Sequence, residues 1–531
     1  MKVIIDPLTR IEGHLKLELD LDDSNHLVSS AKCSATLFRG FESIVKGRDP
    51  RDCAPILSAI CGVCHSDHHI ASVRAVENAG GLLNYVDGYN FEQTTIPKNA
   101  VLARNVVQGA NTVYSHAAHL LVLAGPDYHL YDLLGVLSQS VVINSYADLL
   151  KWVILPAQRL MHQLITLWGG KTPHQRGSVP GGNPVRPTAE VIAQSKARVY
   201  EFRKILDVAA PVIWNFLTAD AVKLSSLGVA TGNFVSMGAF PDPTTSAGTS
   251  RMPLILPRGV ILSPDNRPTS FDPSKITEDV SLSWYDQQDV VPVIGEPTPV
   301  PDMSKSGAYS WAKSPRYAGK ACEVGPLSRL YVAGIYPKLG SVIHGILPAV
   351  PGLPLNPRGS VFDRMACRAL ELVALVGSDN ITPNLKVLNM PLGVSLVDVL
   401  AALGLPRKGL IETWLDAMDV GAPSYTPYAV PQDAEGIGLW EAPRGSLFHW
   451  LSVKSQKVDN YQVIAPTTWN VSPNGPLEAG LVGTPTGTSG TNEDLRMAAW
   501  VVRSFDLCLA CTVHTVDARG NHLYARVNSP W

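Results

Sequence analysis

The sequence lacks any block of basic residues, any long apolar run and any dense set of cysteines. Its 44 Lys and Arg residues are balanced by 46 Asp and Glu residues, so the formal net charge is −2 over 531 residues. Because neither sign of charge accumulates in one stretch, nothing favours a nucleic acid or an acidic lipid as a partner. Eight cysteines are too few for a disulfide framework in a chain of this length.

Signals for membrane insertion and export are missing as well. No apolar stretch reaches the roughly 20 residues that a helix needs to cross a bilayer. The first residues, Met1 to Pro7, show no basic start, apolar core or small-residue cleavage site of a secretory signal. We therefore expect no transmembrane segment in this chain, and we expect that any export depends on a partner.

The composition predicts one large folded body. Hydrophobic residues make up 45% of the chain and charged residues 17%, which leaves apolar surface that a partner subunit could cover. We expect a single multilayer subunit over residues 1–531. Its predicted regions are an N-terminal sheet at 1–50, a first metal motif and helical bundle at 51–235, a loop-rich insertion at 236–360, helices and a second metal motif at 361–514, and a candidate maturation tail at 515–531.

The patterning predicts an α+β fold that is predominantly helical. Residues 1–45 alternate between apolar and polar, which is typical of an antiparallel sheet with one wet face. Pro and Gly are numerous at 238–301 and 345–357, where we expect ordered loops or small sheet additions and not linkers between domains. Helical spacing predicts a central bundle of long helices and two later helices, at 67–79, 98–124, 138–168, 189–217, 385–403 and 492–505.

Two cysteine pairs stand near opposite ends of the chain. Cys61 and Cys64 form one C-x-x-C pair and Cys508 and Cys511 form the other. Four thiolates suit zinc, iron or nickel better than magnesium or calcium. On spacing alone, a structural zinc is favoured over a catalytic centre. Cys64 and Cys508, however, are 444 positions apart, so the fold must close around the metal where both chain ends meet.

Six further signatures accompany the cysteine pairs in a fixed order. They are RIEGH at 10–14, RGFE at 39–42, GGKTPH at 169–174, EVGPL at 323–327, EAPRG at 441–445 and APTTWN at 465–470. This ordered set resembles the large subunit of nickel-iron hydrogenases, most closely the membrane-associated and periplasmic uptake branch. The resemblance runs from Asp6 to His514.

The resemblance implies a Ni-Fe(CO)(CN)2 centre. All four cysteines would bind nickel, with Cys61 and Cys508 as terminal ligands and Cys64 and Cys511 bridging to an iron that carries carbon monoxide and two cyanides. The implied activity is heterolytic cleavage of H2 into two protons and two electrons, more in the direction of uptake. The Cys508 thiolate, a terminal ligand, is a candidate for the base that receives the first proton.

Five other residues match positions around that centre in the family. Glu12 would relay protons from the nickel-bound thiolate, and Arg444 would lie above the vacant metal position. Asp506 would be a carboxylate beside this arginine, Thr467 would donate to a cyanide, and Ser115 stands where many relatives carry an aspartate. Without the resemblance, Glu12 reads as a solvated strand residue, Arg444 as a surface charge and Thr467 as a turn hydroxyl.

The resemblance also implies a second metal site. Glu42 and His514 match ligands of a structural magnesium or iron ion, and the alternative is a pair of buried polar groups with other partners. His68 would donate a hydrogen bond to a bridging sulfur. For His65 and His69, packing or surface roles remain the better interpretation.

Some positions depart from the family pattern. Ala59 replaces an arginine that usually stands two places before the first cysteine, and Leu507 replaces a proline before Cys508. Neither change removes a ligand. Relatives are usually cut after the histidine that matches His514, so a maturation endopeptidase would remove residues 515–531.

The remaining cysteines exclude self-sufficient electron transfer. Cys33, Cys53, Cys322 and Cys367 have no cluster-binding spacing, so the resemblance implies an obligate heterodimer with an iron-sulfur small subunit. That partner would carry the export signal and connect to a membrane cytochrome or a quinone-linked acceptor. We expect a membrane-associated or periplasmic location, with the cytoplasm as the alternative. Two other functions stay open: a quinone-reductase-like subunit without H2 chemistry, and a zinc-stabilised scaffold.

Overall fold

The structure is a computed structural model of the chain. It describes residues 1–128, 136–138, 141–142, 145–245, 251–286, 290–295, 300–336, 356–377, 408–487 and 495–511. His514, the tail at 515–531 and the helix predicted at 385–403 lie outside these ranges.

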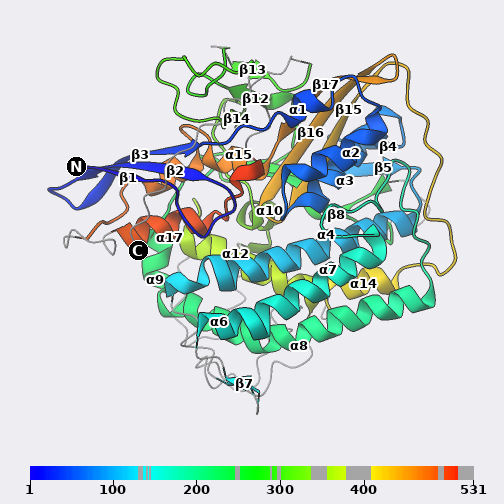
Figure 1. The fold of residues 1–531 in the computed structure, drawn as a ribbon, viewed down its shortest axis with the longest axis horizontal. Helices are drawn as coiled ribbons and strands as arrows, with labels where there is room; N and C mark the ends of the chain where they lie inside the picture. Colours follow the sequence, from blue (N-terminus) through cyan, green and yellow to red (C-terminus); the bar gives the residue numbers. More distant parts are fainter. Residues whose placement is uncertain are drawn as a thin grey trace.

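The N-terminal sheet has the predicted antiparallel form. Strands β1 (Lys2–Ile5), β2 (Leu15–Asp22) and β3 (Leu27–Ala35) pair in that order. Leu15, Leu17 and Leu19 are buried and the residues between them are half-buried, so the alternation in the sequence does separate a core face from a wet face. Figure 1 shows this sheet projecting beside α17 (Arg496–Ser504), which delivers the second cysteine pair.

Long helices pack together on one side of the molecule (Figure 1). They are α4 (Lys98–Ala118), α7 (Leu155–Gly169), α8 (Ala189–Ala219), α12 (Val361–Val376) and the shorter α14 (Leu410–Asp416). Contacts link α4 to α7 and α12, and link α8 to α7 and α12. A π-helical turn (η3, His119–Leu123) prolongs α4 to the predicted end.

The helix predicted at 138–168 begins later than expected. Strands β6 (Val136–Ser138) and β7 (Val141–Val142) occupy its first residues, and helix starts at α6 (Tyr146–Leu149), which continues through η5 (Leu150–Ile154) into α7. Branched residues such as Val141 and Val142 favour strand. The Ser145 hydroxyl accepts the Asp148 amide at 3.2 Å and so caps the helix at its true start.

The Pro- and Gly-rich segment at 238–301 contributes strands to small antiparallel sheets, and most of the other segment, 345–357, lies outside the described residues. One sheet has the order β11-β10-β8 and a second has the order β13-β12-β14, while β9 joins β5 and β4 in a third. Their bounds are β4 (Leu83–Val86), β5 (Phe91–Thr94), β8 (Phe234–Pro241), β9 (Arg251–Met252), β10 (Leu254–Ile261), β11 (Pro268–Thr269), β12 (Ile276–Asp279), β13 (Val290–Pro292) and β14 (Ser314–Tyr317).

A buried three-stranded sheet packs on the helix that follows the first cysteine pair, and the sequence reading missed it. It consists of β15 (Ala434–Ala442), β16 (Gly445–Lys454) and β17 (Lys457–Ile464), and both β15 and β16 contact α3 (His65–Ala79). The backbones of β15 and α3 approach closely, since a Cβ placed on Gly438 would lie 2.0 Å from the Ala71 carbonyl oxygen.

The two chain ends meet through the backbone. Glu12 pairs with Cys508 in a parallel bridge, in which the Glu12 amide donates to the Leu507 carbonyl and the Leu509 amide donates to the Glu12 carbonyl. One hydrophobic core extends from Leu8 to Cys511 and contains all four metal-motif cysteines.

The remaining short elements are α1 (Phe41–Ile44), η1 (Pro50–Asp52), α2 (Cys53–Leu57), η2 (Ser58–Ile60), η4 (Gly125–Tyr128), α9 (Ala221–Ser226), η6 (Pro273–Lys275), α10 (Pro326–Val332), α15 (Pro466–Val471), α16 (Pro476–Leu481) and η9 (Leu509–Cys511). Among the helices in the described ranges, none combines the length and the apolar character that a membrane span requires.

Candidate metal centre

The four cysteines of the two pairs converge on one point. Their Sγ atoms all lie within 4.8 Å of one another, and each residue is at most 2% exposed. Across the two loops, Cys61 Sγ lies 3.2 Å from Cys508 Sγ and Cys64 Sγ lies 3.1 Å from Cys511 Sγ. One small volume therefore holds four thiols that a single ion could contact.

Local backbone geometry presents the first pair. Cys61 is extended, and Cys64 precedes the first residue of α3. The amides of Val63 and Cys64 donate to Cys61 Sγ at 3.2 and 3.3 Å. Amides that point at a sulfur stabilise its thiolate form, so this turn is already arranged for a cysteine that binds metal.

The thiols cannot all ionise in this buried volume without a cation. Burial opposes ionisation of Cys61, but hydrogen bonds from the other three thiols outweigh it and hold the pKa of Cys61 well below its usual range. Burial raises the pKa of Cys508 and of Cys511 well above the usual range. A bound metal would supply the positive charge that full deprotonation requires.

A carboxyl group lies against one of these thiols. The Cys508 thiol donates to Glu12 Oε2 at 2.8 Å, and the Ala510 amide donates to the same oxygen at 3.3 Å. Burial, followed by the negative charge of Cys61, raises the pKa of Glu12 above its usual range. A carboxyl group in this state can accept a proton from the sulfur and release it again.

A buried ion pair lies close to the cysteines. Arg444 Nε is 3.1 Å from Asp506 Oδ1, and both side chains are buried. Burial disfavours the charged form of Asp506, but Arg444, together with His119 and Arg368, lowers the pKa of Asp506 to about 2. Burial opposes the charge of Arg444, but nearby groups, first among them the Asp506 carboxylate, outweigh burial and raise the pKa of Arg444. Arg444 Nη1 is buried and has no hydrogen-bond partner among the described residues.

Comparisons with known proteins agree with this geometry. A family model described as nickel-dependent hydrogenase matches residues 39–142, 139–389 and 412–514, and a model described as HoxL-like matches residues 2–36. The periplasmic [NiFeSe] hydrogenase large subunit of Desulfomicrobium baculatum is 32% identical to this chain, over 98% of this chain and 96% of the relative. The chain belongs to the nickel-dependent hydrogenase family.

A second relative and a solved structure agree with this assignment. The uptake hydrogenase large subunit of Rhizobium leguminosarum bv. viciae is 29% identical, over 99% of this chain and 97% of the relative. The Ni-Fe-Se hydrogenase of D. vulgaris Hildenborough in its reduced state superposes with a TM-score of 0.76 at 30% identity, over 97% of this chain and 100% of that chain. The matches span nearly the whole length of this chain and of each matched chain. This chain is therefore a hydrogenase large subunit, an oxidoreductase that acts on H2.

The sulfur donors fit a nickel-iron centre in this hydrogenase. Four soft thiolates in a buried site favour nickel and iron over hard cations. All four positions are cysteine in this chain. Thr467, in α15, lies beside the same loop, since its Oγ1 accepts the Cys508 amide at 2.9 Å, and its own hydrogen remains able to point elsewhere.

His68 and Ser115 lie on the helices that border this region. His68 Nδ1 is 3.2 Å from His449 Nε2, and burial lowers the pKa of His68 to about 4, so the ring is neutral. Ser115, on α4, is buried, and its hydroxyl has no hydrogen-bond partner among the described residues.

The hydrogenase holds Glu42 in a separate buried polar cluster. Glu42 Oε1 accepts the Val463 amide at 2.8 Å and lies 3.5 Å from Lys313 Nζ. Lys313 also pairs with Glu278 at 2.8 Å. His514, the other expected ligand of a second metal, lies outside the described residues, so this pairing stays a prediction.

Sequence reasoning missed several residues of the centre. Arg39 donates to backbone carbonyls of both cysteine loops. Arg368 lies 3.8 Å from Asp506, and His449 supports His68. Only Arg39 had a signal, because it stands in one of the quoted motifs.

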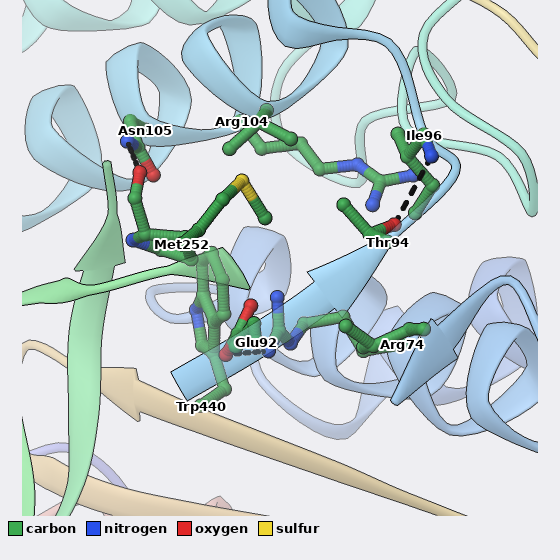
Figure 2. A pocket seen from close by; sticks show the side chains of 11 residues that line it. Arg74, Glu92, Thr94, Ile96, Arg104, Asn105, Met252 and Trp440 are labelled. Carbon is green, nitrogen blue, oxygen red and sulfur yellow. Dashed lines mark hydrogen bonds and ion pairs between the residues drawn. The ribbon is translucent and has the colours of Figure 1, made fainter. Parts of the chain in front are cut away.

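A small pocket beside α3 is not part of the centre. Figure 2 shows Arg74 of α3 and Glu92 of β5 pointing toward one another at its edge, and their ion pair measures 2.5 Å. The pocket has a volume of about 10 Å³, which is room for about one water molecule. None of the predicted site residues lines it, and it is too small for an organic substrate.

Proposed function

We propose that this chain catalyses the heterolytic cleavage and reversible oxidation of H2 and passes two electrons to an iron-sulfur small subunit. The observation that supports this most directly is the contact between a buried four-cysteine set and a carboxyl group, Cys508 Sγ to Glu12 Oε2 at 2.8 Å. A structural zinc site has no need of a proton acceptor at this position.

We assign the metal ligands by family position. Cys61 and Cys508 would hold nickel as terminal ligands, and Cys64 and Cys511 would bridge nickel to an iron that carries one carbon monoxide and two cyanides. When bound, this centre supplies a redox-active metal pair that polarises H2 and accepts its electrons. The protein contributes four thiolates, water exclusion through burial, and groups that receive protons.

The first proton leaves through the chain's own side chains. The Cys508 sulfur holds it, and the 2.8 Å contact lets it move to Glu12 Oε2. Because the pKa of Glu12 is raised by burial, the carboxyl group can stay protonated long enough to hand the proton toward solvent. Glu12 is half-buried, which places it between the closed centre and the surface.

The polar residues around the cysteines would orient the bound ligands. Arg444 keeps one buried guanidinium nitrogen without a partner among the described residues, so it can donate to a ligand above the metals. Asp506 fixes this guanidinium through their ion pair. Thr467 would donate its hydroxyl hydrogen to a cyanide, and Ser115, in place of an aspartate, would make the surroundings of Arg444 less acidic.

Two further assignments concern supporting positions. Since His68 Nδ1 already meets His449, Nε2 is the nitrogen that would donate to a bridging sulfur. Glu42 and His514 would bind a structural magnesium or iron ion, with the Lys313 ammonium close to Glu42.

The partners that we propose are those that would carry the electrons away from this chain. The four cysteines outside the metal motifs have no cluster-binding spacing, so an iron-sulfur small subunit would carry the electrons in an obligate heterodimer. It would deliver them to a membrane cytochrome or a quinone-linked acceptor at the membrane or in the periplasm. A maturation endopeptidase would remove residues 515–531.

The proton step is tested by Glu12→Gln in the purified heterodimer. A glutamine cannot accept the proton from Cys508, so we expect H2-driven reduction of a viologen dye to fall at least about 100-fold. Nickel and iron contents should stay unchanged, because the substitution removes no thiolate.

The matched control is Glu18→Gln in β2, the strand that follows Glu12. Glu18 pairs with Lys2 and Lys16 at the surface of β2, away from the cysteines, and its variant should keep full activity. Equal rates for Glu12→Gln and the parent enzyme would contradict the proposed relay.

A further inference from the structure

Arg39 lies between the two cysteine loops. It follows β3 and comes two residues before α1. Its Nη2 atom donates to the Ile60 carbonyl and, at 2.5 Å, to the Ala510 carbonyl. Ile60 directly precedes Cys61 and Ala510 directly precedes Cys511. A single nitrogen thus joins two loops that are 450 positions apart in the sequence.

The guanidinium suits this place for a geometric reason. An Nη2 group carries two hydrogens in the plane of the fork, at fixed directions, so it can donate one to each loop at the same time. Arg39 Nη1 lies 3.5 Å from the Ala59 carbonyl and adds to the contact with the first loop. A lysine ammonium is a compact charge on a flexible stem and lacks this fork.

The second loop has a separate anchor that does not depend on Arg39. The Glu12 backbone holds it through the Leu507 carbonyl and the Leu509 amide. These contacts fix the loop to the N-terminal strand region, before and after Cys508. The carbonyl that Arg39 contacts lies further along, next to Cys511, which faces Cys64 at 3.1 Å.

We propose that Arg39 is a positioning residue that latches the second cysteine loop onto the first. It fixes the distance between the Cys61–Cys64 pair and the Cys508–Cys511 pair, and the latch forms when residues 508–511 dock. The inference rests on the proposed role of these cysteines as metal ligands. The latch itself consists of protein atoms alone, so it can be tested with and without metal.

The first test uses the metal-free full-length chain. Its eight cysteines are all free and buried, so iodoacetamide labelling followed by peptide mass mapping reports each loop separately. In Arg39→Lys, we expect Cys508 and Cys511 to react at least 10-fold faster than in the parent chain. Cys33, Cys322 and Cys367, which lie outside the motifs, should react at the parent rate.

Arg203→Lys is the matched control. Arg203 is buried and also bridges two segments through backbone carbonyls, those of Val376 and Lys408, but it belongs to the helical bundle. Its variant should leave the labelling of Cys508 and Cys511 unchanged. Parent-like labelling of the second loop in Arg39→Lys would overturn the latch, and so would an equal rise at all eight cysteines, which would indicate a general structural role.

The second test uses the nickel-loaded heterodimer and a chelator. We expect Arg39→Lys to release nickel at least 10-fold faster than the parent enzyme, with no such change in Arg203→Lys. If the site held zinc, the proposed function would fail while the labelling result could still stand. Parent-like release of nickel would overturn the positioning role.

Discussion

At the scale of single residues, burial controls the chemistry of the centre. The same burial that raises the pKa of Cys508 and Cys511 also raises the pKa of Glu12, while Arg444 and its neighbours lower the pKa of Asp506 to about 2. The two carboxyl groups near the centre, those of Asp506 and Glu12, therefore differ in their tendency to hold a proton. Asp506 is a fixed anion, and Glu12 can exchange a proton.

Asp67 provides a pH test of this environment. It is fully buried three positions after Cys64, and it accepts from Trp440 Nε1 at 3.1 Å and from Asn111 Nδ2 at 2.7 Å. Burial raises the pKa of Asp67 to about 7. The folded chain keeps this proton between pH 4 and 7, whereas the unfolded chain releases it near 3.8. Asp67 therefore lowers stability as pH rises through this range, by up to about 1.4 kcal/mol per pH unit.

The measurement compares denaturation midpoints of the metal-free chain at pH 5 and pH 7. Asp67→Asn is neutral at both values, so its stability relative to the parent should rise from pH 5 to pH 7. The asparagine has only one side-chain oxygen for the two donors, Trp440 Nε1 and Asn111 Nδ2, so one hydrogen bond is lost. This loss costs the same stability at both pH values. Asp265→Asn, at an exposed position, should follow the parent. Parallel behaviour of Asp67→Asn and the parent would exclude the raised pKa.

The placement of residues that belong to local motifs could be predicted from the sequence, and the placement of those that depend on long-range packing could not. The two C-x-x-C spacings predict that the four cysteines share one site, and their Sγ atoms lie within 4.8 Å of one another. The RIEGH motif indicates Glu12, and Glu12 contacts Cys508. Arg368 lies 138 positions before Asp506, and His449 lies 381 positions after His68. Neither their spacing nor their surroundings in the sequence indicate a place at the centre.

At the scale of elements, the centre depends on how α3 is held. Strand β15 lies directly on α3, and glycines allow the contact. A Cβ on Gly436 would lie 2.2 Å from the Ala75 carbonyl oxygen, and one on Gly438 would lie 2.0 Å from that of Ala71. The sequence reading missed this sheet because most of its residues are buried on both faces, so no clear alternation marks it. By contrast, the half-exposed N-terminal sheet was predicted.

Gly438→Ala tests whether this packing sets the first cysteine loop. The added methyl group must displace β15 or α3, and overpacking of this kind costs roughly 1–3 kcal/mol. We expect a lower melting temperature and less nickel per purified chain, because α3 begins directly after Cys64. Glu435→Ala, at an exposed position of the same strand, should change neither quantity. A parent-like melting temperature and nickel content in Gly438→Ala would show that the contact between β15 and α3 tolerates a methyl group, and would contradict this prediction.

At the scale of the whole molecule, the metal centre is the place where the chain closes. The first pair lies in the first eighth of the sequence and the second pair near its end, yet one core contains both. The parallel bridge between Glu12 and Cys508 and the proposed Arg39 latch both join an early segment to the last described one. Under the proposed function, such a closure would let the second loop dock last, after the metals have entered.

The central claim is that the four cysteines hold a nickel-iron centre, and elemental analysis combined with infrared spectroscopy of the purified heterodimer tests it most directly. We predict about one nickel per chain together with iron, with four thiolates as the natural ligand set, and infrared bands of bound carbon monoxide and cyanide. Both metals and bands should be lost in Cys508→Ser and Cys511→Ser. Zinc in place of nickel, with no such bands in the parent protein, would contradict the account.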